Sequence, residues 1–346
     1  MKYIIDSYIF SFREDMQKEE LEGYLQTISD LDKWWKNHRE EIYVMSNISS
    51  ILFEHGFYPL KEKLAPLLKK YDSDFEYRDI QRMLNHYIEQ TSFIDDICTK
   101  EYIEKTQETY KTNVDVVIAD RPEAFQMSFF DLMWFVFCLH VIENNEIDSY
   151  IVFSKPIDKP ILIEYNYEYI NLDKDPEILM SEKSEVTITC HSSLDSFQRD
   201  RNTPFLLWRY SICKSDLDIG LRCKILQEEK LDNIEDIEKK YHFSFQDSFY
   251  KDFCDNRYAN RPSDINSALD SMLKVILDIR HGKEHNMRTS MGGNAPYVFH
   301  GDYAGMRKNI TTSIKLHYWK KTPYYQFAKI GEHDFFDIPW EDYNMT

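Results

Sequence analysis

The most apolar run of the chain, FFDLMWFVFCLHVI at residues 129–142, sets the first constraint on the fold. It is shorter than the roughly 20 residues that a membrane-spanning helix needs, and Asp131 and His140 interrupt it. A helix that is apolar on all sides must be surrounded by other elements. The run therefore predicts a buried core helix that begins near Ser128, inside a body large enough to cover it.

The chain is long enough for more than one such body. Its 346 residues exceed the size at which a single core usually stops growing. Hydrophobic residues make up 42% and charged residues 29% of the chain, which are the proportions of a folded protein. We expect two or three domains of α+β class.

Three regions differ in their periodicity. Residues 1–147 show apolar positions three and four residues apart, which predicts a mainly helical domain with a few short strands. Residues 148–235 alternate between apolar and polar, which predicts an antiparallel β-rich region that includes 204–213 and 220–226. Residues 240–346 predict a small α+β domain, in which helices precede an antiparallel sheet.

Acidic and basic residues are unevenly distributed. The net charge is −18, so the molecule as a whole should repel nucleic acid and anionic membrane surfaces. Between Lys251 and Ile330, however, 13 Lys and Arg stand against 7 Asp and Glu. This contrast predicts an anionic ligand for the C-terminal end.

Cysteine and motif content narrows the function classes. Six scattered cysteines without a C-x-x-C pair predict free thiols in a reducing cytoplasm, and we do not expect MKYIIDSYIF at the start to be a signal peptide. The chain has no G-x-x-x-x-G-K-[ST], G-x-G-x-x-G, H-E-x-x-H or G-x-S-x-G motif. We expect a cytoplasmic protein with no cofactor, no metal and no membrane contact.

The last strands sort their side chains by face. Alternation predicts Ile314, Leu316 and Tyr318 on the face packed against a helix that runs from Ser263 to Gly282. The opposite, open face would carry basic and aromatic residues from three strands: Arg307, Lys308, Lys315, His317, Trp319 and Lys329, with His333 just beyond the last strand. Such a face holds phosphates by charge-assisted hydrogen bonds and bases by stacking, although a solvated sheet face also displays Lys and His.

These basic side chains could catalyse a cleavage of RNA that needs no metal ion. The 2′-OH attacks the adjacent phosphate when a base removes its proton, an acid protonates the leaving oxygen, and Arg or Lys stabilises the developing charge. We expect Arg307, His317 and His333 to be the catalytic residues.

The order GDYAGMRKN, IKLHYW and AKIGEHDFF resembles a RelE/HigB-type toxin domain over about residues 260–336. The resemblance implies a compact α+β domain that cleaves RNA without metal, often mRNA on the ribosome, and that pairs with an acidic antitoxin. It places Arg307 at the scissile phosphate and His333 as acid or base. It assigns RNA binding to Lys308, Lys315 and Lys329.

Two weaker resemblances point to other ribonucleases. RHGKEH at 280–285 resembles the motif of HEPN ribonucleases, which implies that Arg280 and His285 meet across a helical dimer interface and cleave RNA without metal. We also expect Arg280, Lys283 and His285 to bind RNA. The opening MKYIIDSYIF resembles the first strand of PIN nucleases, whose carboxylates bind Mg²⁺ or Mn²⁺. That reading would use Asp6, Glu54 and Asp131, but Ser154 stands where the family usually has Asp.

Together these observations predict a bacterial, metal-independent endoribonuclease of toxin or phage-defence type, with a regulatory acidic N-terminal part. Its partners would be RNA and an acidic antitoxin or another defence-system protein. The alternative is a non-catalytic interaction subunit of such a system, and a HEPN- or PIN-type ribonuclease is the further alternative.

Overall fold

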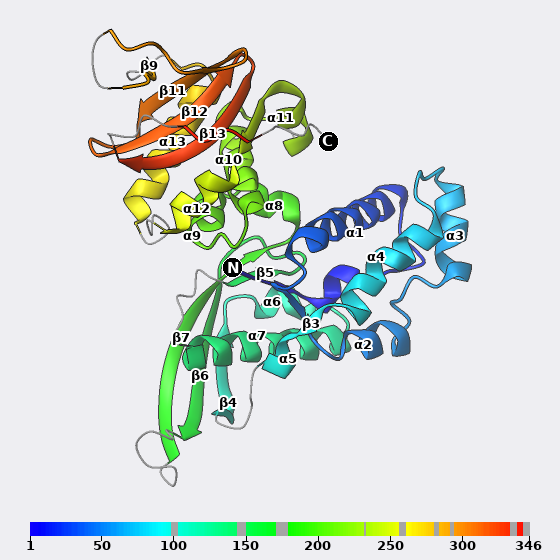
Figure 1. The fold of residues 1–346 in the computed structure, drawn as a ribbon. Helices are drawn as coiled ribbons and strands as arrows, with labels where there is room; N and C mark the ends of the chain where they lie inside the picture. The colour runs from blue at the N-terminus through cyan, green and yellow to red at the C-terminus, as the bar shows by residue number, and fades with distance from the viewer. Residues whose placement is uncertain are drawn as a thin grey trace. The chain divides into compact units, whose positions relative to one another are not determined.

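The computed structural model describes residues 1–97, 103–143, 150–170, 179–231, 233–255, 261–279, 284–290, 294–332 and 338–341. It divides the chain into two compact units, unit 1 (Met1–Phe197) and unit 2 (Gln198–Thr346), where the sequence suggested three regions (Figure 1). Helices and mixed sheets together confirm the α+β class. The expected β-rich region 148–235 is shared between the units, because only its first half forms strands.

Unit 1 contains the strands β1 (Lys2–Ile5), β2 (Ile42–Val44), β3 (Ser92–Phe93), β4 (Ile103–Thr112), β5 (Tyr150–Phe153), β6 (Ile161–Ile170) and β7 (Leu179–His191). Its helices are η1 (Ser7–Phe10), α1 (Lys18–His38), α2 (Ile48–Glu54), α3 (Lys61–Lys70), α4 (Tyr77–Glu89), α5 (Ile94–Ile97), α6 (Asp115–Ala119) and α7 (Glu123–Glu143). The helix α8 (Leu194–Arg199) crosses from unit 1 into unit 2.

The described strands of unit 1 form one sheet in the order β3-β2-β1-β5-β7-β6-β4. The five neighbouring strands β3, β2, β1, β5 and β7 run parallel to one another. The strands β6 and β4 continue the sheet with antiparallel pairing. The antiparallel expectation is therefore wrong for β5, whose residues Tyr150–Phe153 are all buried, as in strands covered on both faces. The chain winds outward in opposite directions from β1 and β5, so their carboxyl ends meet at a topological switch point, where open parallel sheets usually bind ligands.

The predicted core helix is α7. Its residues from Leu132 to Leu139 are all 5% exposed or less. They pack in one cluster with apolar residues of β5, β6 and β7, including Val152, Ile163 and Ile188. Within the described ranges, no helix combines the length and apolarity that a membrane crossing requires.

Unit 2 contains the helices α9 (Thr203–Arg209), α10 (Lys214–Glu229), α11 (Ile234–Lys240), α12 (Asp247–Asp255) and α13 (Pro262–Ile276). Its strands are β8 (His242–Phe245), β9 (Glu284–Asn286), β10 (Phe299–His300), β11 (Tyr303–Asn309), β12 (Ile314–Lys321) and β13 (Tyr324–Glu332). They form a sheet in the order β10-β11-β12-β13-β8, and β9 also pairs with β11. The ladder is antiparallel except where β8 runs parallel to β13.

The expected sheet-and-helix packing of unit 2 is present. Ile314, Leu316 and Tyr318 belong to one buried cluster with α13 residues such as Leu269 and Met272. Tight turns join the strands, one at Gly301 with a left-handed φ of 54° and one at Thr322–Pro323. The predicted helix that leads into the sheet ends at Ile276.

The segments 204–213 and 220–226 are largely helical rather than extended. Asp216 caps α10 by accepting the Ile212 and Cys213 amides, and buried Leu217 and Leu221 stand one turn apart. These helices contribute Trp208, Leu217 and Leu221 to the same core as the sheet. A domain boundary at 235–240 would therefore cut through this core.

Charge divides between the two units. Unit 2 has 22 Lys and Arg against 22 Asp and Glu, whereas unit 1 has 20 against 38. The whole net charge of −18 therefore belongs to unit 1. The five described cysteines are free thiols, as expected.

Candidate functional site

A row of basic side chains crosses the sheet of unit 2. Arg307 on β11 lies directly opposite His285 on β9 and His317 on β12, and His317 lies opposite Lys329 on β13. Directly opposite residues of neighbouring strands point to the same face, with Cβ atoms about 4.5–5.5 Å apart. These four residues, the basic row, combine two imidazoles with a guanidinium and an ammonium group.

A β-bulge completes the row. The β12–β13 register shifts between His317 and Tyr318, so that Tyr318 opposes Phe327 while His317 opposes Lys329. In a regular strand Phe327 and Lys329 would share one face. The extra residue, Ala328, lets Phe327 enter the core while Lys329 joins the row.

The basic row is accessible mainly at its β9–β11 end. His285 is exposed and Arg307 is half-buried, and neither side chain has a hydrogen bond or ion pair to another described residue. At the other end, Lys329 Nζ lies 3.5 Å from Asp252 Oδ2, and burial raises the pKa of Asp252 while Lys329 opposes the rise. The exposed end therefore pairs an imidazole with a guanidinium.

The expectation of an open face is wrong along β12. His317 is fully buried, and Lys315 and Trp319 are 4% and 3% exposed. Burial, followed by the charge of Arg307, lowers the pKa of Lys315, whose Nζ donates to the Thr312 carbonyl at 3.1 Å. Trp319 packs with Ile338 and Trp340 from the C-terminal segment and donates to the Pro339 carbonyl at 2.7 Å.

Lys308 points away from the basic row. It opposes Leu316 and alternates with Arg307, which places it on the face covered by α13. Its Nζ lies 3.7 Å from Glu284 Oε1, and burial lowers its pKa although Glu284 opposes this effect. Arg307 and Lys308 therefore do not contact one ligand on one face.

The remaining predicted residues fall into two groups. Arg280, Lys283 and His333 lie outside the described residues. His285 belongs to β9, so the last two residues of the RHGKEH motif, Glu284 and His285, lie in a strand and not in a helix. Of the nine predicted site residues, the structure gathers Arg307, His317, His285, Lys315 and Lys329 on one face.

At the switch point of unit 1, the carboxylate of Asp6 is fully engaged. Arg121 Nη1 donates to Asp6 Oδ2 at 2.7 Å and Arg121 Nη2 donates to Ser154 Oγ at 2.7 Å. Ser154 Oγ donates to the same Asp6 oxygen at 2.6 Å, and Arg121 also donates to the Lys155 carbonyl. The guanidinium fills the position where an open parallel sheet usually admits a ligand.

The carboxylates of the PIN-type prediction are not gathered around Asp6. Glu54 is exposed at the end of α2, and Asp131 lies half-buried on α7. Among the described residues, no cluster of three or more His, Cys, Asp or Glu side chains could hold a metal ion. The sequence feature that could have indicated the Asp6–Arg121 ion pair is Arg121 itself, because it is the only Lys or Arg between Lys111 and Lys155.

No family model, curated protein or solved structure matches the chain.

Proposed function

We propose that unit 2 is an endoribonuclease that cleaves RNA without a metal ion. The observation that supports this most is the position of Arg307, directly opposite the exposed His285 and the buried His317. A guanidinium beside an accessible imidazole supplies the two functions that the reaction requires, charge stabilisation and proton transfer.

In the proposed reaction, His285 removes the proton from a ribose 2′-OH. The 2′ oxygen then attacks the adjacent phosphorus, and Arg307 stabilises the charge on the pentavalent phosphorane. The bond to the 5′ oxygen breaks, and that oxygen takes up a proton from water or from an imidazolium. The products are a 2′,3′-cyclic phosphate and a 5′-hydroxyl. His317 positions Arg307 from the buried side, and Lys329 extends the positive surface.

The proposed activity fits a toxin or phage-defence protein of a bacterial cytoplasm. RNA, including mRNA on the ribosome, would be the substrate, and an acidic antitoxin or other defence protein would be the partner. Unit 1 would be the regulatory part, because its net charge of −18 opposes the approach of RNA to the chain.

Burial favours a second candidate function. His317 is fully buried and Lys315 is 4% exposed, so two of the site residues predicted from the sequence are held inside the protein. A non-catalytic interaction subunit would need only the exposed end of the basic row to bind its partner. Binding of RNA or of an acidic protein without any cleavage would support this alternative.

Substitutions at the accessible end of the basic row distinguish the two functions. The full chain is incubated in EDTA with a mixed-sequence RNA, alone and in the presence of ribosomes. We expect cleavage that Arg307→Ala and His285→Ala each reduce by about 100-fold or more. Lys321→Ala is the matched control, because Lys321 lies at the far end of β12 and pairs with Asp302 at 2.9 Å. RNA that is bound but stays intact would overturn the catalytic proposal.

A further inference from the structure

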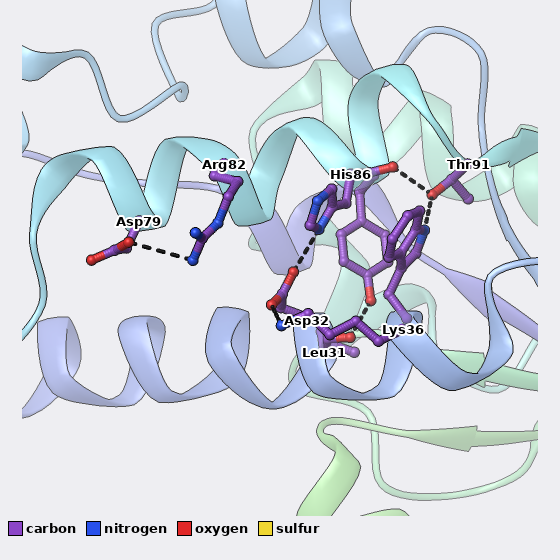
Figure 2. A network of polar contacts seen from close by, with 9 residues as sticks. Leu31, Asp32, Lys36, Asp79, Arg82, His86 and Thr91 are labelled. Carbon is purple, nitrogen blue, oxygen red and sulfur yellow. Dashed lines mark hydrogen bonds and ion pairs between the residues drawn. The ribbon is translucent and has the colours of Figure 1, made fainter.

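A second group of polar side chains lies in unit 1, on helix α4 beside α1 (Figure 2). Arg78, Arg82 and His86 follow one another at intervals of four residues, so they share one face of α4. They border a shallow, open cleft along the surface of α4, and its other lining residues, from the same helix and its C-terminal cap, are polar: Gln81, Asn85, Glu89 and Gln90. Cationic and amide groups thus gather at one place on a unit whose net charge is −18.

His86 is held by a buried carboxylate. Its Nδ1 lies 2.6 Å from Asp32 Oδ1, and Asp32 is 2% exposed (Figure 2). Lys36 Nζ lies 2.8 Å from the other oxygen, Asp32 Oδ2. An ionised carboxylate only accepts hydrogen bonds, so Nδ1 carries the proton that is donated to Asp32. Nε2 is then the ring nitrogen that remains for a ligand.

The ring of His86 is also fixed in orientation. Trp35 stacks on it with ring centroids 4.3 Å apart and an angle of 7° between the planes. Trp35 Nε1 donates to Thr91 Oγ1 at 2.9 Å, and Thr91 Oγ1 donates to the His86 carbonyl at 2.8 Å. These contacts preorganise the imidazole, so little conformational entropy is lost when a ligand binds.

The two arginines remain available. Arg78 is exposed and has no hydrogen bond or ion pair to any group in the described part of the chain. Arg82 has a 3.4 Å contact to Asp79, but their side chains are 62% and 45% exposed, so this pair is weak. If the Asp32–His86 pair served only to join α1 and α4, the arginines on the two preceding turns of α4, Arg78 and Arg82, would have no part in it.

We propose that this cleft binds the phosphate group of a small ligand, such as a nucleotide. Arg78 and Arg82 present planar forks that match phosphate oxygens, and His86 Nε2 supplies a third contact. Glu89 lies at the opposite end of the lining from Arg78, so the negative group of the ligand is directed toward the arginines. The amides of Gln81 and Asn85 are placed to contact the rest of the ligand.

Calorimetry and NMR on the full chain test the site with two probes, inorganic phosphate and uridine 5′-monophosphate. We expect saturable binding and a shift of the His86 imidazole resonances with at least one probe. Equal affinity for both would assign recognition to the phosphate alone. Tighter binding of the nucleotide that is lost in Gln81→Ala would show contacts to its remaining part.

Exposed substitutions keep the test independent of folding. Arg78→Ala/Arg82→Ala should weaken binding by at least about tenfold, while Arg39→Ala, which removes an exposed arginine outside the cleft, should not. Binding should also weaken in His86→Asn. The proposal is overturned if neither probe binds saturably, if the His86 resonances do not move, or if Arg39→Ala weakens binding as much as the double variant.

Discussion

Arg121 and Asp6 form a buried ion pair across the switch point of the parallel sheet. Arg121 Nη1 lies 2.7 Å from Asp6 Oδ2, and both side chains are 1% exposed. Asp6 follows β1 and Ser154 follows β5, so the pair joins the two strands from which the sheet winds outward. This pair occupies the position that enzymes with such sheets use for ligands, and it supports placing the proposed chemistry in unit 2.

Arg121→Ala should strongly destabilise unit 1. The substitution leaves the carboxylate of Asp6 buried without its cation, which costs about 3–5 kcal/mol. Hydrogen exchange of the β1 and β5 amides measures this loss in the full chain. Arg13→Ala is the control, because Arg13 pairs with Glu20 at 2.7 Å but both are about half exposed, so it should cost less than about 1 kcal/mol. Similar small losses in both variants would contradict the assigned role of Arg121.

Two glycine-to-alanine substitutions should have opposite effects. A Cβ at Gly220 would lie 2.6 Å from Trp208 Cδ1 and 3.2 Å from the Pro204 carbonyl, so Gly220→Ala should cost about 1–3 kcal/mol through overpacking. A Cβ at Gly23, within α1, meets no atom within 4 Å, and Gly23→Ala should stabilise by about 0.5–1 kcal/mol. Urea unfolding of each variant measures the change in the free energy of unfolding, which should fall in Gly220→Ala and rise in Gly23→Ala.

Arg307→Met and Lys308→Met should differ in RNA affinity although the residues are adjacent. Arg307 belongs to the basic row, so its loss should weaken RNA binding by about tenfold or more. Lys308 is 4% exposed on the opposite face, so its loss should leave RNA affinity unchanged. Fluorescence anisotropy with a labelled RNA makes the comparison, and equal weakening in both variants would contradict the assignment of faces.

Lys308 also predicts a pH dependence of stability. Burial holds the pKa of Lys308 below its ordinary value, so the unfolded chain binds this proton more tightly than the folded chain. The contribution of Lys308 to stability should therefore rise as the pH increases from the lowered pKa toward the ordinary lysine pKa. Urea unfolding across this range should show the rise in the native chain and a smaller rise in Lys308→Met.

Tyr58 predicts the opposite trend at alkaline pH. Burial, followed by the nearby Tyr77 and Glu89, raises the pKa of Tyr58 from 10.0 to about 12. Between these values the unfolded chain loses the proton that the folded chain keeps, so stability falls as the pH rises. From pH 9 to pH 11, the native chain should lose roughly 1 kcal/mol more than Tyr58→Phe in urea unfolding. If the free energy of unfolding fell equally in the native chain and in Tyr58→Phe, the pKa of Tyr58 would be the same in the folded and the unfolded chain.

Local patterns in the sequence were sufficient for features that depend on neighbouring residues. The apolar run at 129–142 identified the core helix α7, and alternation placed Leu316 and His317 on opposite faces of β12. Both follow from side-chain direction within one element. The same reasoning gave strands for 204–213 and 220–226, where the cap at Asp216 and the packing of Gly220 on Trp208 favour helices.

Features that depend on distant pairing were not predictable in this way. The pairing of β1 with β5 joins residues near the start of the chain to Tyr150–Phe153, and no periodicity encodes it. The contact between Asp6 and Arg121 depends on that pairing. The bulge at Ala328 and the C-terminal segment over Trp319 likewise decide which basic residues reach solvent.

The chemistry of RNA cleavage products tests the proposed function most directly. The full chain is incubated in EDTA with a defined RNA, and the ends of the fragments are identified by mass spectrometry. We predict 2′,3′-cyclic phosphate and 5′-hydroxyl ends, and cleavage at a given site should stop when that ribose is replaced by 2′-deoxyribose. Intact RNA, or cleavage that requires Mg²⁺ or Mn²⁺ and leaves 5′-phosphate ends, would contradict a metal-independent site at Arg307 and His285.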